Sequence, residues 1–160
     1  MKCIIFIASF TFALSSSNAY AQKVSAYKSA DYTLMVQELN SRLKSPWGMT
    51  FLPDKRLLVT EKNGTILIIS ADGKTIEQRI ENLPTVVDRG QGGLLDVVLD
   101  PDFSNNNTIY WSYTEAGKGK DKNLTGTAIA RGQLRNNTLQ NISVIYRQTP
   151  KVKGDGHFGS

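Results

Sequence analysis

His157 is the only histidine of the 160-residue chain, and it lies in the polar, glycine-rich segment Gly154-Asp155-Gly156-His157-Phe158-Gly159-Ser160. The imidazole is the side chain whose ordinary pKa allows proton transfer near neutral pH. A single histidine between glycines therefore predicts a general base, if a substrate hydroxyl can approach to about 3 Å. A lone histidine is more often an ordinary surface or core residue, so this interpretation depends on the rest of the sequence.

The elements that would position this residue are strands. Short apolar or alternating runs, rich in β-branched and aromatic residues, recur between turn residues, and no helix is predicted, which is typical of an all-β chain. Asn63-Gly64 predicts a hairpin with a type I′ turn, because both residues tolerate the positive φ that this turn requires. The expected strands are 32–39, 47–52, 56–61, 65–70, 94–99, 108–114, 127–134 and 142–148.

An internal repeat predicts the architecture. Phe51-Leu52-Pro53-Asp54 followed by 57–61 is echoed by Leu99-Asp100-Pro101-Asp102 followed by 109–115, and the two prolines lie 101 − 53 = 48 positions apart. A four-stranded unit that repeats every ~40–50 residues is typical of a β-propeller blade. Two similar hairpins in a β-sandwich are the alternative.

Residues 1–21 have the features of a cleaved secretory signal peptide. Lys2 supplies a charge, an apolar run too short for a permanent membrane anchor follows, and Ala19-Tyr20-Ala21 precedes the expected cleavage point. Removal of Cys3 leaves no cysteine, and a periplasmic or secreted location is expected.

The charge of the remaining chain argues against a nucleic-acid partner. The total charge of +5 less Lys2 leaves +4, and the basic residues are scattered rather than gathered in a stripe. The lysines at 118, 120 and 122 are interpreted as a solvated loop.

The remaining residues, 22–160, are 160 − 21 = 139 in number and accommodate only part of a propeller. Such a fold closes with typically 4–8 blades, whereas ~45 residues a blade allow about three here. We therefore expect the N-terminal portion, about two to three blades, of a propeller whose C-terminal part is absent. Residues 1–160 alone would then carry unpaired strand edges and be poorly soluble.

Three segments, in this order and spacing, resemble one family. They are Pro46-Trp47-Gly48-Met49-Thr50-Phe51-Leu52-Pro53-Asp54 with 57–61, then Asp88-Arg89-Gly90-Gln91-Gly92-Gly93-Leu94-Leu95-Asp96-Val97 with Asp100-Pro101-Asp102-Phe103, and finally Gly156-His157-Phe158-Gly159-Ser160. From about Tyr32 to its end, the chain resembles the N-terminal part of the soluble aldose sugar dehydrogenases that depend on pyrroloquinoline quinone (PQQ), within the glucose/sorbosone dehydrogenase family. The three segments together, in this order, are a more specific sign of the family than any one of them alone.

The resemblance implies a six-bladed propeller with PQQ at one end of the central axis and a calcium ion beside it. In that family a histidine takes the proton of the hydroxyl on the sugar's anomeric carbon while hydride passes to the quinone, giving a lactone. The matching histidine is His157, and the glutamine that contacts the cofactor in relatives matches Gln91. Calcium ligands and most PQQ contacts are expected in the absent C-terminal part, so the fragment alone is expected to be inactive. The implied partners are an aldose and an external electron acceptor, with no membrane anchor.

The residue types agree with these roles. A Gln91 amide can donate to a quinone or carboxylate oxygen without adding charge. Arg89 could reach a cofactor carboxylate or form a salt bridge at the rim. Glycines at 90, 92, 93, 156 and 159 allow a backbone to approach a flat ring, although those at 90 and 159 fit ordinary turns equally well.

Other positions carry open or weaker interpretations. Some relatives have an acidic residue immediately before the histidine, but here that position is Gly156, which favours the broader-specificity aldose branch. Asp155 could orient the imidazole instead, or be a turn aspartate. Asp96, Asp100 and Asp102 are expected on a strand face and in a turn rather than around a metal ion. Trp47 and Trp111 are expected to pack between blades.

Two rival functions remain at this point. A propeller lactonase would centre on a metal with carboxylate ligands, and its activity would depend on calcium without PQQ. A non-catalytic propeller that binds carbohydrate or protein would keep its function when His157 is replaced by alanine.

Overall fold

The computed structural model describes residues 23–159, so the predicted signal peptide, 1–21, lies outside the described residues. The chain divides into two units, 1–38 and 39–160. The described part of the first unit is an antiparallel hairpin of β1 (Val24–Lys28) and β2 (Thr33–Gln37). The sequence predicted the second of these strands and not the first, because Val-Ser-Ala-Tyr-Lys carries little apolar alternation.

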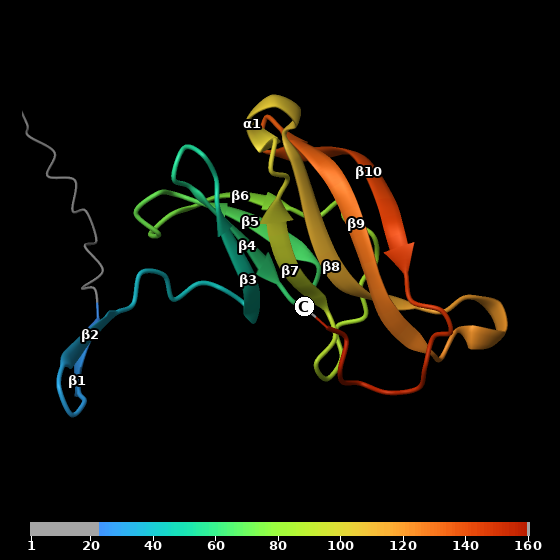
Figure 1. Ribbon diagram of the computed structural model, residues 1–160, viewed down its shortest axis with the longest axis horizontal. Coiled ribbons are helices and arrows are strands. Elements are labelled where there is room, and N and C mark those ends of the chain that lie inside the picture. The colour runs from blue at the N-terminus through green and yellow to red at the C-terminus, as the bar shows by residue number, and fades with distance from the viewer. Residues whose placement is uncertain (1–22, 160) are drawn as a thin grey trace, which may run out of the picture. The chain divides into compact units, whose positions relative to one another are not determined.

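The second unit contains two four-stranded antiparallel sheets (Figure 1). Each sheet pairs its strands in chain order, as a propeller blade does, so the predicted all-β propeller fold is confirmed. The described residues form two of the two to three blades that were expected. None of the helices among residues 23–159 has the length and apolar character that crossing a bilayer requires. The first sheet comprises β3 (Pro46–Phe51), β4 (Leu57–Glu61), β5 (Thr65–Ile69) and β6 (Ile76–Ile80), and the second comprises β7 (Leu94–Leu99), β8 (Thr108–Ala116), β9 (Thr125–Arg135) and β10 (Thr138–Arg147).

The sequence repeat occupies the same place in both sheets. Pro53-Asp54 turns the chain from β3 into β4, and Pro101-Asp102 turns it from β7 into β8. The second connection is longer and contains α1 (Phe103–Asn106), a single turn that ends where Asn107 adopts a left-handed φ of 54°. The blade interpretation of the repeat is therefore confirmed, although a one-turn helix forms where only a turn was predicted.

The inner strands β3 and β7 pack against each other, and the main core lies between the two sheets (Figure 1). Its members are almost wholly buried: Leu58, Ile66 and Ile68 of the first sheet, and Leu94, Ile109, Trp111 and Tyr113 of the second. Burial of this apolar surface is the main force that holds the blades together.

Only one of the two tryptophans packs in this core. Trp111 is 1% exposed, as predicted, whereas Trp47 is 47% exposed and is not part of the core between these two sheets. The cause is strand alternation. Gly48 faces the second sheet, where an added Cβ would lie 2.8 Å from Asp96 Oδ1, so the preceding Trp47 must point to the opposite face.

Two hairpin turns differ from the sequence prediction. Asn63-Gly64 does connect β4 and β5, but Glu61 pairs with Thr65, which leaves a three-residue loop in which Gly64 has a positive φ of 100° and Asn63 does not. The two-residue turn with both central φ values positive occurs instead at Asn136-Asn137, between β9 and β10.

Candidate active site

Two loops at one end of the second sheet bring together the residues that the sequence predicted. Residues 88–93 lead into β7, and a crossing segment, 148–159, follows β10 and passes the ends of β9 and β8 (Figure 1). Thr125 and Val152 exchange two backbone hydrogen bonds of 2.9 Å, and the Gln91 N–H donates to the Asp155 carbonyl over 2.7 Å. The two predicted site regions are therefore in direct contact.

The side chain of Gln91 holds the backbone of His157. Gln91 Oε1 accepts a hydrogen bond of 2.9 Å from the His157 N–H, where the backbone has a left-handed φ of 62°. Because a backbone N–H can only donate, the amide oxygen must face it, and Gln91 Nε2 is left as a donor. Both residues are exposed, and within residues 23–159 the His157 imidazole has no hydrogen-bond partner. The contact places a neutral donor beside an accessible base.

Arg89 and Asp155 form an ion pair between the same two loops. Arg89 Nε lies 2.7 Å from Asp155 Oδ1, and both side chains are about half exposed. The Asp155 carboxylate thus binds Arg89 and does not contact the imidazole of His157. Since the pair uses Nε, the two terminal NH2 groups of Arg89 can still donate to another acceptor.

Glycines let these loops approach other parts of the backbone. Gly90 has a φ of 57°, and an added Cβ would lie 2.4 Å from the Asp155 carbonyl oxygen. Gly93 has a φ of 140°, and an added Cβ would lie 2.5 Å from the Lys62 carbonyl oxygen. Both positions therefore require glycine for the contact between protein segments, which is a different reason from the approach to a flat ring that the sequence suggested.

Lys62, in the β4–β5 loop, supports the Gln91 loop from the first blade. Its Nζ donates to the Gly90 carbonyl over 2.7 Å and lies 3.8 Å from Asp88 Oδ1. The same ammonium group lies 5.9 Å from the centre of the Trp47 ring, within cation–π range. Sequence reasoning missed Lys62, because a lysine in a hairpin turn gives no local sign of a contact 28 residues away.

Glu115, near the end of β8, anchors the crossing segment. It accepts hydrogen bonds of 3.0 Å from Lys151 Nζ and from Arg147 Nε. Burial alone would raise the pKa of Glu115, but the hydrogen bonds and charges of Lys151 and Arg147 outweigh it and hold that pKa below its ordinary value. Burial, with a smaller contribution from Glu115, raises the pKa of neighbouring Tyr113 to about 12.

We expect Glu115→Gln to lower the free energy of unfolding of the full-length gene product by about 1–2 kcal/mol at neutral pH. The reason is that Lys151, whose side chain is only 13% exposed, loses its anionic partner. Since folding lowers the pKa of Glu115, its stabilisation is complete above the unfolded pKa and is lost as pH falls through the folded pKa. Thermal unfolding midpoints should therefore converge for variant and wild type at acid pH.

Glu77→Gln is the matched control for this prediction. Glu77 pairs with Arg56 over 3.3 Å at a site where its side chain is 36% exposed, and exposed pairs contribute about 1 kcal/mol at most. If the stability that Glu115→Gln loses relative to wild type stays constant from neutral to acid pH, the ion-pair explanation is contradicted.

The three aspartates that follow Gln91 have strand-face and turn roles. Asp96 Oδ1 accepts from the next backbone N–H over 2.9 Å. Asp100 accepts from Asn106 Nδ2, the Asp102 N–H and the Tyr110 hydroxyl, and these hydrogen bonds, the one from Asn106 most, hold the pKa of Asp100 below its ordinary value. Residues 23–159 contain no group of three or more histidine, cysteine or acidic side chains placed to hold a metal ion.

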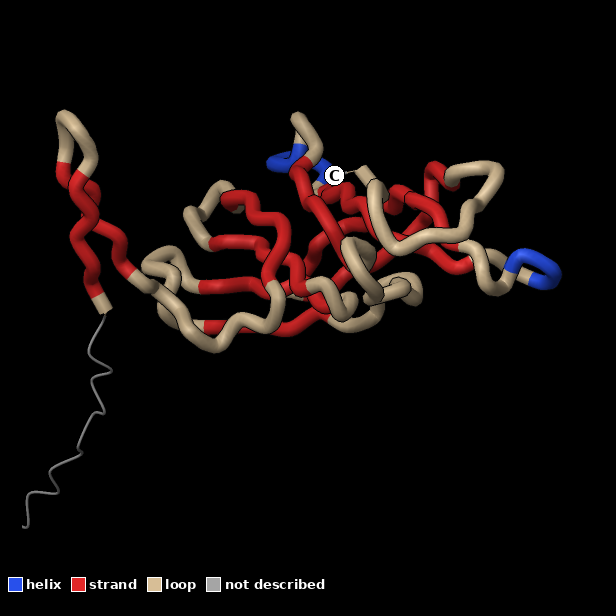
Figure 2. Tube along the Cα trace, turned by 90° about the horizontal axis from the view of Figure 1, so that it is seen from below, coloured by secondary structure: helices blue, strands red, loops and turns tan. Residues whose placement is uncertain are grey.

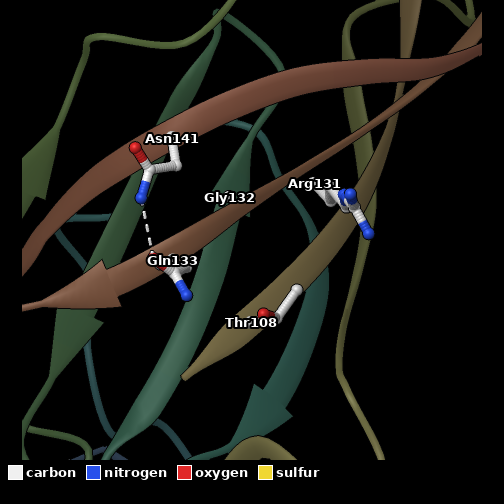
Figure 3. Close-up of a pocket in the computed structure, with 5 residues that line it drawn as sticks. All are labelled: Thr108, Arg131, Gly132, Gln133 and Asn141. Carbon is white, nitrogen blue, oxygen red and sulfur yellow. Dashed lines mark hydrogen bonds between the residues drawn. The ribbon is translucent and has the colours of Figure 1, made fainter. Parts of the chain in front are cut away.

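A hollow on the second sheet lies far from these loops. It is lined by Thr108 of β8, Asn141 of β10 and residues 131–133 of β9, and Asn141 Nδ2 donates to Gln133 Oε1 over 2.8 Å (Figure 3). Thr108 lies about 20 Å along β8 from Thr114, whose backbone bonds the Gln91 loop. The lining contains no histidine, cysteine or carboxylate, so the hollow offers no base.

The residues of both loops lie within a segment of the chain that matches known proteins. The family model for glucose/sorbosone dehydrogenases matches residues 43–160. The aldose sugar dehydrogenase YliI of Escherichia coli K12 is 38% identical over 138 residues, which are 84% of this chain and 36% of that protein. The quinoprotein glucose dehydrogenase B of Acinetobacter calcoaceticus is 31% identical over 106 residues, which are 64% of this chain and 22% of that protein.

A solved structure of a relative is also similar to this chain. The soluble aldose sugar dehydrogenase of Escherichia coli in its apo-form superposes with a TM-score of 0.69 at 33% identity, over 87% of this chain and 36% of that chain. The chain thus spans about a third of the length of the Escherichia coli relatives.

Proposed function

Because the chain belongs to the glucose/sorbosone dehydrogenase family, we propose that the full-length gene product oxidises aldose sugars at the anomeric carbon to lactones, with PQQ as cofactor. The observation that carries this proposal is the contact between Gln91 and His157. It joins the two residues to which the family resemblance gives cofactor contact and proton removal. The relative named a quinoprotein, 31% identical to this chain, supports a quinone cofactor.

The residues of the two loops fit a flat, anionic cofactor. Gln91 Nε2 is a neutral donor whose orientation is set by the His157 N–H. The carboxylate in the crossing segment, Asp155, is neutralised by Arg89, so it would not repel an anion strongly. We therefore assign Gln91 as a cofactor contact and Arg89 as a second one through its terminal NH2 groups.

In the proposed reaction, His157 accepts the proton of the hydroxyl on the anomeric carbon at an imidazole nitrogen. The hydrogen on that carbon leaves with its electron pair, and the C–O bond becomes the carbonyl of the lactone. PQQ, when bound, supplies the two-electron acceptor. A neutral imidazole removes the proton without bringing a fixed negative charge toward an anionic cofactor. Gln91 and the Arg89–Asp155 pair keep the loop that carries His157 in place.

The remaining parts of the proposal rest on the family resemblance and on the sequence of the first residues. Calcium is proposed as a second cofactor, with ligands from the part of the full-length protein beyond this chain. An external electron acceptor would reoxidise the cofactor. The signal-like residues 1–21 support export to the periplasm or beyond the cell.

The test is reconstitution of the full-length gene product, purified without cofactor. PQQ is titrated in with calcium or with a chelator, and dye reduction is followed with several aldoses. We expect no reduction without PQQ and saturable reduction with it. If PQQ neither stays bound after desalting nor supports dye reduction, the proposal fails. Lactone hydrolysis that needs calcium and not PQQ would then identify a lactonase, and carbohydrate binding without turnover would identify a binding propeller.

A further inference from the structure

A groove of about 940 Å³ lies beside the candidate active site. Three segments line it: the loop before β7, the β8–β9 loop that carries η1 (Gly119–Asp121), and the crossing segment. Figure 2 shows η1 as the short helical turn at the tip of a loop that projects beyond the strands. This volume is in the range of sites that enclose small organic ligands.

The groove is strongly cationic. Arg89, Lys120, Lys122 and Lys153 line it, and the carboxylate in its lining is that of Asp155, so four cations and one anion leave three positive charges. Asp155 is already paired with Arg89. In the part of the chain that the structure describes, none of the three lysines has an ion-pair partner, whereas nearby Lys151 is bound to Glu115.

Both walls of the groove are held in place by hydrogen bonds. The η1 loop is closed by bonds from the Gly117 N–H to the Leu124 carbonyl and from the Leu124 N–H to the Asp121 carbonyl, both of 2.8 Å. The crossing segment is tied to β9 by the Thr125 hydroxyl, which donates to the Gly154 carbonyl over 3.1 Å. The lysines therefore project from ordered backbone, although the sequence suggested only a solvated loop for two of them.

We propose that this groove binds the anionic group of a small acidic sugar, a carboxylate or a phosphate, next to the loop that carries His157. The inference deepens the proposed function and rests on it for the identity of the ligand as a sugar. A concave site bounded by three segments favours a small molecule over the flat face of an acidic protein. Attraction by three ammonium groups would strengthen binding of acidic aldoses relative to neutral ones, and would weaken with ionic strength.

The experiment compares glucose, glucuronic acid and glucose 6-phosphate with the reconstituted full-length gene product. The variant is Lys120→Gln, Lys122→Gln and Lys153→Gln combined. The control combines Lys55→Gln, Lys74→Gln and Lys118→Gln, which removes the same charge from exposed sites outside the groove lining. We expect the groove variant to raise KM for an acidic aldose by about tenfold at low salt and to leave glucose unchanged. The control variant should leave KM unchanged both for the acidic aldose and for glucose.

A binding measurement separates this inference from the proposed function. Titration calorimetry of glucose 6-phosphate and glucuronic acid with the cofactor-free full-length protein should show weaker binding in the groove variant alone. If binding weakens in the groove variant although no sugar is oxidised, the groove inference is supported and the dehydrogenase proposal fails. If sugars are oxidised and the groove variant matches the control with both acidic ligands, the groove inference is wrong. If the groove variant binds only glucose 6-phosphate more weakly, the groove is a phosphate site. If it binds only glucuronic acid more weakly, the groove is a carboxylate site.

Discussion

His157→Ala in the full-length gene product is expected to lower PQQ-dependent aldose oxidation by about 10²–10⁴-fold, the range for loss of a general base. The structure gives the reason. The imidazole is exposed on a loop that Gln91 fixes at the His157 N–H, and within residues 23–159 it has no competing hydrogen-bond partner. Removing it leaves the loop bonds intact, because they involve the backbone of His157. Retention of PQQ after desalting should therefore be unchanged.

His157→Asn is the matched variant for this prediction. Asparagine tolerates the left-handed φ of 62° at this position and can form hydrogen bonds, but it is not a base at neutral pH. We expect it to be as inactive as His157→Ala. Activity within tenfold of wild type in either variant would contradict the assignment of His157 as the base.

The second large effect is expected at Gln91, where two substitutions separate two roles. Gln91→Glu keeps an oxygen to accept from the His157 N–H but replaces the donor with a negative charge, so we expect PQQ affinity to fall by about 10²-fold with little change in thermal stability. Gln91→Leu removes both groups, so it should lose PQQ affinity and also loosen the loop, with a lower kcat at saturating PQQ. Fluorescence titration with PQQ and thermal unfolding measure the two effects.

Asn106 offers a control for these substitutions. It is an amide side chain that also makes a hydrogen bond, to Asp100, but it lies in the β7–β8 turn at the other end of the sheet. Asn106→Asp should leave PQQ affinity unchanged. If Gln91→Glu binds PQQ as tightly as wild type, Gln91 does not contact the cofactor and serves only to hold the His157 loop.

Much of the fold could be predicted from local sequence patterns. The strand 94–99 has the predicted bounds, and the repeated Pro-Asp turn located the first connection of each blade. β6 was missed because Ile76-Glu77-Gln78-Arg79-Ile80 has apolar residues only at its ends, as suits an edge strand. The exposure of Trp47 could not be predicted, because the identity of a residue does not reveal which strand face a neighbouring sheet will cover.

The site could be predicted less completely. The sequence nominated His157, Gln91 and Arg89, but their contacts join positions 66 residues apart, and such pairings depend on how the blades pack. The open question about Asp155 was decided by a side chain on the other loop, Arg89. The role of Lys62 could not be predicted for the same reason, because its hydrogen-bond and ion-pair partners, Gly90 and Asp88, lie in the loop that leads into the second sheet.

The most direct test of the assignment of Gln91 and His157 is a crystal structure of the full-length gene product with PQQ and a bound aldose. We expect Gln91 Nε2 to donate to an oxygen of the cofactor, and the His157 imidazole to lie about 3 Å from the hydroxyl on the anomeric carbon. PQQ bound at a place out of reach of both side chains would contradict the account.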